Sequence, residues 1–173
     1  MCDITDTIDA PCGANPGGIS KVYIAAVGSV DVIPAATTAT HSIDTDITMV
    51  ATKKFHRVDN TAEVGEFNEA LTGEIDAQFI NRVLTLTVPG MNQENVAKFQ
   101  GMLGGKFIAI VVYVDGQKRV IGDKTNPLKL RKSDHASGKA GSTDRRGHTF
   151  ELYSPGANYA YFYTPALTTI VNE

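Results

Sequence analysis

The segment Phe107–Gly122 constrains the fold of this chain more than any other part of the sequence. It opens with an apolar run, FIAIVVYV, and the pair Asp115 and Gly116 follows at once. A short apolar run that ends in a turn is typical of a strand buried on both faces. An Asp-Gly pair between two strands is a strong hairpin signal, because both turn positions favour positive φ. The segment therefore predicts a β-hairpin with a fully buried first strand.

Alternating residues predict further strands on both sides of this hairpin. The clearest is Ala77–Val88, where Ile80, Leu84 and Leu86 share one face that Arg82 interrupts. β-Branched residues and threonines, which suit a pleated surface, dominate it. We also expect strands at Lys21–Val27, Lys53–Val58, Ala62–Leu71, His148–Tyr153 and Tyr159–Tyr163. The composition of Ala62–Leu71 also suits a helix, but the strand that follows it needs an antiparallel partner.

One segment has the pattern of a helix, at about residues 92–104. Asn92 is a favourable N-terminal cap. Val96, Phe99 and Leu103 fall at helical spacing and predict one apolar stripe. Two glycines follow the stripe and supply a left-handed stop.

The chain of 173 residues suits a single domain with an arm. Residues 1–20 are rich in glycine and proline and follow neither strand nor helix periodicity, so we expect an extended N-terminal arm there. Residues 21–173 then form the domain, which includes a long polar loop at about 123–147. The fold class that follows is mainly β, an antiparallel β-sandwich or barrel with one short α-helix.

Charge is distributed unevenly along the chain. Residues 117–148 hold nine lysines and arginines against three aspartates, a net charge of +6, whereas residues 1–116 have a net charge of −7. A basic block in an acidic chain fits a nucleic-acid contact. It equally fits one half of a head-to-tail protein contact, with the acidic part as the other half. A solvated loop rich in lysine is the third interpretation.

The sequence shows no catalytic or metal-binding pattern. It has two cysteines, Cys2 and Cys12, which exclude a disulfide framework and a four-thiolate zinc site. Neither a nucleophile elbow nor a zinc-protease helix occurs, and Ser133–Ala140 departs from the phosphate-loop pattern at two required positions. The longest apolar run, Ile108–Val114, is too short to cross a bilayer. We therefore expect no enzyme activity, no cofactor, no metal and no membrane contact.

Tyrosines gather near the end of the chain, at Tyr153, Tyr159, Tyr161 and Tyr163. They suit alternation between the core and an intersubunit face, because tyrosine buries area while its hydroxyl stays satisfied. With the neighbouring arginines they also suit stacking on single-stranded nucleic acid.

The order of these segments resembles the tail tube proteins of tailed bacteriophages. The likeness rests on the threonine-containing strand Phe79–Val88, the helix Asn92–Leu103, the hairpin Phe107–Gly122, the polar segment that follows and the closing strand His148–Tyr153. The start of the chain, Met1–Thr5 with Cys12, is also similar to small structural proteins of phages from Bacteroidetes-type hosts.

The resemblance implies a structural virion protein. Six copies would form a ring whose sheets join into a continuous inner barrel with a net acidic lining, and stacked rings would conduct DNA without sequence-specific binding. The implied partners are further copies and other tail or connector proteins, in a virion assembled in the host cytoplasm. We expect intersubunit contacts at Lys129, Arg131, Lys132, Lys139, Arg145, Arg146, Tyr159 and Tyr161. A head–tail connector, a capsid decoration protein and a nucleic-acid-binding β-barrel are the alternatives.

Overall fold

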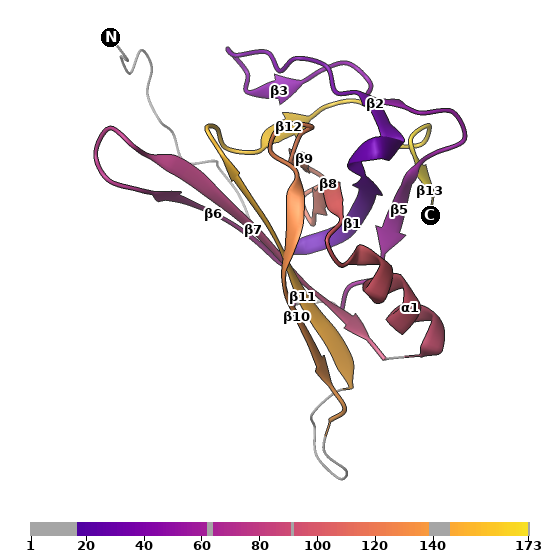
Figure 1. Ribbon diagram of the computed structural model, residues 1–173. Coiled ribbons are helices and arrows are strands. Elements are labelled where there is room, and N and C mark those ends of the chain that lie inside the picture. The colour runs from indigo at the N-terminus through magenta and orange to yellow at the C-terminus, as the bar shows by residue number, and fades with distance from the viewer. Residues whose placement is uncertain (1–16, 62–63, 91, 139–145, 173) are drawn as a thin grey trace.

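A computed structural model describes residues 17–61, 64–90, 92–138 and 146–172, and this part of the chain is mainly β (Figure 1). The first seven strands are β1 (Ile19–Ala26), β2 (Val30–Val32), β3 (Ser42–Ile43), β4 (Thr48–Met49), β5 (Phe55–Val58), β6 (Glu66–Thr72) and β7 (Phe79–Pro89). Then follow α1 (Gln93–Met102), β8 (Lys106–Tyr113), β9 (Lys118–Ile121), β10 (Leu128–Ala136), β11 (Gly147–Gly156), β12 (Tyr161–Tyr163) and β13 (Val171–Asn172). The predicted mainly-β class is confirmed.

Strands β1 and β8 form the centre of the fold and are buried on both faces. In β1, Val22 and Ile24 point into one apolar cluster while Tyr23 and Ala25 point into another. Strand β8 alternates in the same way, which is why its sequence is apolar at nearly every position. The predicted strand with two buried faces is therefore confirmed.

Two cores lie on either side of these central strands. The first core packs β1 and β8 against β7 and β11 through residues such as Leu84 and Phe150. The second core packs the opposite face against short elements through residues such as Phe55 and Tyr163. The result is a layered, sandwich-like arrangement.

One large sheet connects both layers, in the order β13-β5-β1-β8-β10-β11-β7-β6. The sheet forks at β8, because residues 109–112 of β8 pair with β9 while residues 106–107 pair with β10. Strand β9 in turn pairs with β12, and β12 with β3. The fork separates two halves of the sheet. The compact half contains β13, β5, β1, β8, β9, β12 and β3, and the long, open half contains β10, β11, β7 and β6.

The predicted hairpin is formed by β8 and β9, but its turn differs from the predicted two-residue type. The Tyr113 N–H donates to the Gln117 carbonyl, and the Asp115 carboxylate accepts from the Gln117 N–H at 2.9 Å. Only Gly116 has a positive φ, of 87°. The aspartate therefore supports the loop through its side chain and keeps an ordinary backbone conformation.

Helix α1 confirms the predicted helix and its cap, since the Asn92 side chain accepts a hydrogen bond from the backbone of the first turn. The predicted stripe is only partly correct. Phe99 and Met102 pack against the first core, but Val96 and Leu103 are 46% and 55% exposed. The helix turns the Phe99–Met102 side inward, so the other two apolar residues lie on an open flank.

The predicted long polar loop at 123–147 is wrong over Leu128–Ala136, because these nine residues form β10, which pairs with β11 as far as Ala136 and Gly147. The strand is polar because almost all of its side chains after Leu128 are exposed. Residues 139–145 lie outside the described residues. So does most of the predicted arm, and β1 begins within that arm at Ile19.

Leu84→Ala should destabilise the protein by about 2–5 kcal/mol, because it opens a cavity in the first core where Leu84 is fully buried. Leu71→Ala is the matched control on the neighbouring strand, since Leu71 is 56% exposed, and its cost should stay within about 0.5 kcal/mol. Urea unfolding followed by circular dichroism measures both. Equal losses would contradict the assignment of the core.

Candidate assembly surface

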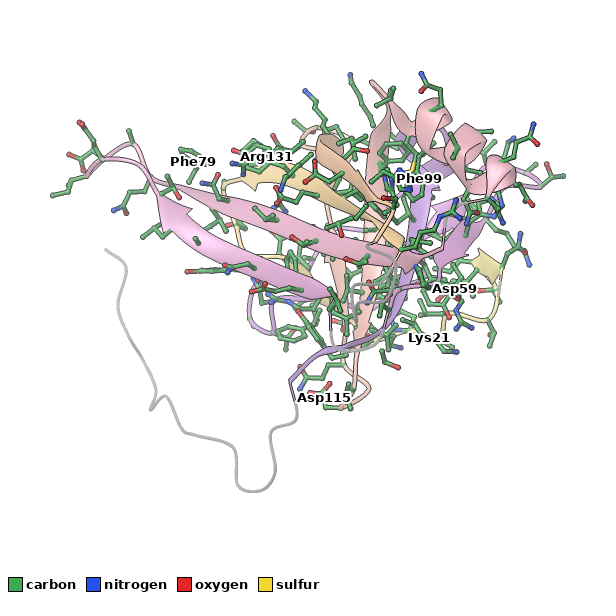
Figure 2. The ribbon with its side chains drawn as sticks, turned by 90° about the horizontal axis from the view of Figure 1, so that it is seen from below. Lys21, Asp59, Phe79, Phe99, Asp115 and Arg131 are labelled. Atoms are coloured by element: carbon green, nitrogen blue, oxygen red, sulfur yellow. The ribbon has the colours of Figure 1, made fainter. Side chains whose placement is uncertain are left out.

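The open half of the sheet extends beyond both cores as four long antiparallel strands. The β6–β7 hairpin projects from one end and the β10–β11 hairpin from the other (Figures 1 and 2). The strands are in register across their full width, because Glu66, Thr85, Glu151 and Lys132 form one continuous row. The open half thus presents a continuous twisted sheet bounded by two outer strands.

Both outer strands have a free edge within the described part of the chain. Strand β6 pairs with β7 alone, along Glu66–Thr72. Strand β10 pairs with β8 only at Leu128 and Lys129, so its remaining seven residues are unpaired on that side. Unpaired strand edges carry free N–H and C=O groups and are templates for pairing with another chain. A register shift between Leu130 and Lys132 marks a bulge on β10.

The face of this sheet that points away from the first core is polar and balanced in charge. Lys132 pairs with Asp134 at 2.8 Å between Nζ and Oδ2, and the Arg131 guanidinium lies 5.4 Å from the centre of the Tyr153 ring. The charged residues of this outer face are Glu66, Asp134, Glu151, Lys129, Arg131 and Lys132. Cations and anions are equal in number, so the expected net acidic lining is not found on this face.

A buried ion pair holds the base of the β6–β7 hairpin to the compact half. Glu69 and Arg119 lie 2.6 Å apart, with side chains 8% and 16% exposed. The same Glu69 accepts a hydrogen bond from the Ala160 N–H, and Arg119 donates to the Ala160 carbonyl at 2.7 Å. Arg119 also lies 4.9 Å from the ring centre of Phe162. The network connects β6, β9 and the segment before β12, and so fixes where the hairpin leaves the body.

The arginine that interrupts the apolar face of β7 is also buried. Arg82 is 4% exposed and donates to the Ser154 hydroxyl and the Pro155 carbonyl, both at 3.2 Å. Burial lowers the pKa of Arg82, and the nearby Asp123 carboxylate opposes that shift. A Cβ on Gly156 would lie 2.1 Å from the Arg82 guanidinium, so this glycine provides the space that the arginine occupies.

Three of the expected contact residues lie together on β10. Lys129, Arg131 and Lys132 are all exposed, and Lys129 is the cross-strand partner of Lys106 on β8. Lys106 was missed because it lies outside the basic block and joins it only through the pairing of β8 with β10. These four cations are called the basic cluster below.

The other expected contact residues do not join this cluster. Tyr159 is 48% exposed, and Tyr161 packs its ring against His41 with ring centres 4.5 Å apart, both in the compact half. Arg146 is exposed just before β11. Lys139 and Arg145 lie outside the described residues. The structure therefore places Tyr159 and Tyr161 in another part of the molecule than Lys129, Arg131 and Lys132.

The remaining cations of the basic block serve the fold itself. The Lys118 ammonium donates to the Thr164 carbonyl at 3.2 Å, and the Lys124 ammonium donates to the Asp31 carbonyl. Arg119 belongs to the buried pair with Glu69. Only part of the positive charge of this segment is therefore available to a partner.

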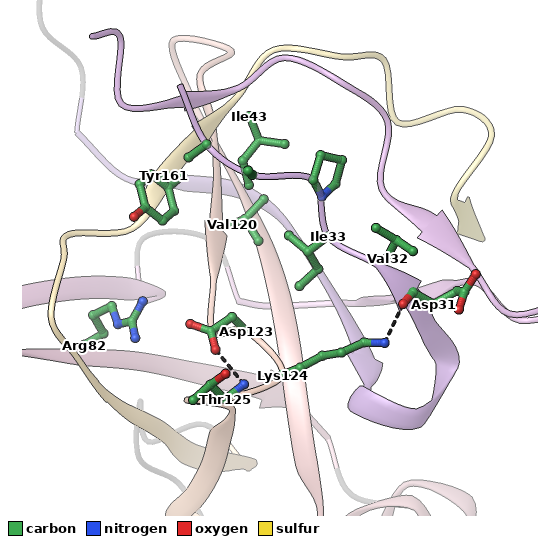
Figure 3. Close-up of a pocket in the computed structure, with 14 residues that line it drawn as sticks. Asp31, Val32, Ile33, Ile43, Arg82, Val120, Asp123, Lys124, Thr125 and Tyr161 are labelled. Carbon is green, nitrogen blue, oxygen red and sulfur yellow. Dashed lines mark hydrogen bonds between the residues drawn. The ribbon is translucent and has the colours of Figure 1, made fainter. Parts of the chain in front are cut away.

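A cavity of about 420 Å³ lies between the loop that follows β2 and the end of β9 (Figure 3). Apolar residues such as Ile33, Ile43 and Val120 line much of it. Its charged residues balance, since Asp31, Asp123, Arg82 and Lys124 contribute two charges of each sign. Neither a net charge nor a cluster of metal-ligating residues within the described part of the chain marks this cavity as a binding site.

His148 on β11 is a buried titratable group. It is 6% exposed, its Nε2 lies 2.9 Å from the Ser133 hydroxyl, and its Nδ1 has no hydrogen-bond partner among the described residues. Its ring stacks on Phe99 of α1 with ring centres 3.9 Å apart. Burial lowers the pKa of His148, the nearby His135 lowers it further, and Asp134 opposes both effects.

Comparisons with known protein families, with curated proteins and with solved structures find no match for this chain. Among the described residues, no helix is long and apolar enough to cross a membrane. The surface must therefore be interpreted from its own geometry.

Acidification should weaken the protein through His148. Because its folded pKa is lowered, its contribution to stability is complete above the unfolded value of about 6.5 and is lost as the pH falls below that value. We expect the free energy of unfolding to drop between about pH 7.5 and about pH 5.5, and His148→Phe to reduce this drop. His56→Gln is the control, because His56 is exposed. An unchanged pH profile in His148→Phe would contradict the assignment.

Glu69→Gln should destabilise the protein by about 3–5 kcal/mol, since it leaves the Arg119 guanidinium buried without its counter-charge. Glu66→Gln, an exposed change on the same strand, should cost at most about 0.5 kcal/mol. Chemical denaturation measures both values. A similar cost for the two variants would show that the buried pair does not hold the hairpin.

Proposed function

We propose that this protein is a structural subunit that assembles edge to edge into rings, as the tail tube subunit of a tailed bacteriophage. The single observation that carries the proposal is the four-stranded sheet with a free edge on each side. All neighbouring strands in it are antiparallel. Strand β10 of a second copy, placed beside β6, therefore continues the antiparallel order with no change in strand direction.

The two free edges differ from each other, which determines the kind of assembly. A contact between β6 of one copy and β10 of the next is head-to-tail, and such contacts form a ring when the rotation between copies closes and an open filament when it does not. Closure joins the sheets into a barrel and removes every free edge. The number of six copies in a ring comes from the resemblance to tail tube proteins.

The outer face of the sheet would then line the channel. Its cations are matched by acidic residues on the same face, and Lys132 and Asp134 form a direct pair. Strong DNA binding requires cations that neutralise phosphates, so a balanced face suits the passage of DNA without sequence-specific binding. The proposal includes location in the virion and contacts with other tail or connector proteins.

One specific observation supports a second candidate, a nucleic-acid-binding β-barrel. Arg131 stacks on Tyr153 beside Lys129 on an exposed face, which is an arrangement that can hold single-stranded nucleic acid. That candidate requires binding that weakens steeply with salt. Fluorescence anisotropy with labelled single-stranded DNA at two salt concentrations separates it from a channel wall.

The purified protein should form sixfold rings or hollow tubes at high concentration, because pairing of the free edges satisfies their backbone groups. Negative-stain electron microscopy and light scattering measure the shape and the mass. A discrete trimer would instead favour a capsid decoration protein. A monomer at every concentration would contradict assembly through the sheet edges.

A further inference from the structure

The end of the β6–β7 hairpin is both acidic and apolar. Ile75 is 85% exposed between Glu74 and Asp76, and Leu71 and Phe79 are 56% and 36% exposed beside it. The turn at this tip requires a glycine, because Gly73 has a positive φ of 114° and a Cβ there would lie 2.3 Å from the Ala77 carbonyl oxygen. Exposed apolar groups on a shaped, projecting tip indicate a surface that another chain covers.

The basic cluster offers the complementary charge. Lys106 and Lys129 are neighbours across the β8–β10 pair, and Arg131 and Lys132 follow on β10. Within the part of the chain that the structure describes, Lys106 and Lys129 form no ion pair. The same holds for the two acidic residues of the tip. Each surface therefore presents charges that form no ion pair with another described residue.

These two surfaces cannot meet within one molecule. The tip belongs to β6 and β7, the cluster to β8 and β10, and β11 and β7 separate the two outer strands. Three strand spacings place β6 and β10 about 14 Å apart across the sheet. Opposite charges on opposite edges are complementary only between copies.

We propose that the acidic tip of one copy docks against the basic cluster of a second copy when the β6 and β10 edges pair. The inference rests on the proposed function, since it names the contact that joins neighbouring subunits. It also determines the stagger between them. Without any shift, Lys132 of the second copy would stand beside Glu66, and the tip would extend past the cluster unmatched.

A shift of four residues toward the tip brings the surfaces together. The row order then places β6 beside the free stretch of β10 in the second copy, which begins at Leu130, with Glu74 and Asp76 continuing toward Lys129 and Lys106. An even shift keeps every side chain on its own face, and it sets Leu71 opposite the half-buried Leu130. Closing a sheet into a barrel requires such a stagger.

Charge reversal tests the contact with two variants. Copies of the same variant should not assemble with one another, but copies of one variant should assemble with copies of the other. The tip variant is Glu74→Lys with Asp76→Lys, and the cluster variant is Lys106→Glu with Lys129→Glu. Each should raise the concentration needed for assembly by about tenfold or more, because like charges meet in every contact. An equimolar mixture should assemble near the wild-type concentration as alternating copies, and the fourfold variant should do so alone.

Lys53→Glu with Lys54→Glu is the control pair of lysines away from both surfaces, and it should assemble like the wild type. Circular dichroism confirms that each variant is folded. Wild-type assembly in either reversed variant, or no recovery in the mixture and the fourfold variant, overturns the docking. If every variant forms rings at the wild-type concentration, the docking is wrong and the proposed ring assembly still holds. If only small oligomers form, and the reversals disrupt and restore them as described, the docking is supported and the ring is contradicted.

Engineered cysteines test the stagger itself, in a background with Cys2→Ser and Cys12→Ser. Leu71→Cys with Leu130→Cys should cross-link assembled copies under oxidation, because the shifted register makes these residues neighbours. Phe67→Cys with Leu130→Cys is the matched control and reports the unshifted register. Cross-linking in the control pair and none in the first pair would overturn the proposed stagger.

Discussion

Burial of β8 on both faces is the constraint on which the rest of the structure depends. A strand with apolar side chains on both faces needs two covers, and each cover must come from a different part of the chain. Strands β7 and β11 cover one face, and short elements from both ends of the described chain cover the other. Because β7 and β11 serve as a cover on one face only, their opposite face and their far ends remain open.

The position of the open half depends on polar groups at its base. Glu69, Arg119 and Arg82 are buried where the β6–β7 hairpin leaves the body, and each has defined partners there. Buried charges tolerate little displacement, since loss of a partner leaves a desolvated charge. Together with the pairing of β7 with β11, the ion pair therefore fixes the direction in which the hairpin leaves the body.

The elements that could be predicted from the sequence are those that local residue patterns determine. The buried hairpin strand, the cap of α1 and the alternation in β1 depend on neighbouring residues, and they follow from the sequence. Strand β10 is predicted as part of a loop because its exposed residues are polar and its partner, β11, begins eleven residues after its end. Lys106 was missed for the same reason, since only the β8–β10 pairing places it beside Lys129.

The unequal distribution of charge along the chain acquires a geometric meaning in the fold. Part of the basic segment is used internally, as in the pairing of Arg119 with Glu69, and what remains lies on β10 at one edge of the sheet. Glu74 and Asp76, which form no ion pair with a described residue, lie at the tip beside the other edge. A bulge and lysines on an edge strand disfavour indiscriminate pairing. On the proposed docking, the partner of such an edge brings matching acidic charge, and the β6–β7 tip of a second copy carries that charge in Glu74 and Asp76.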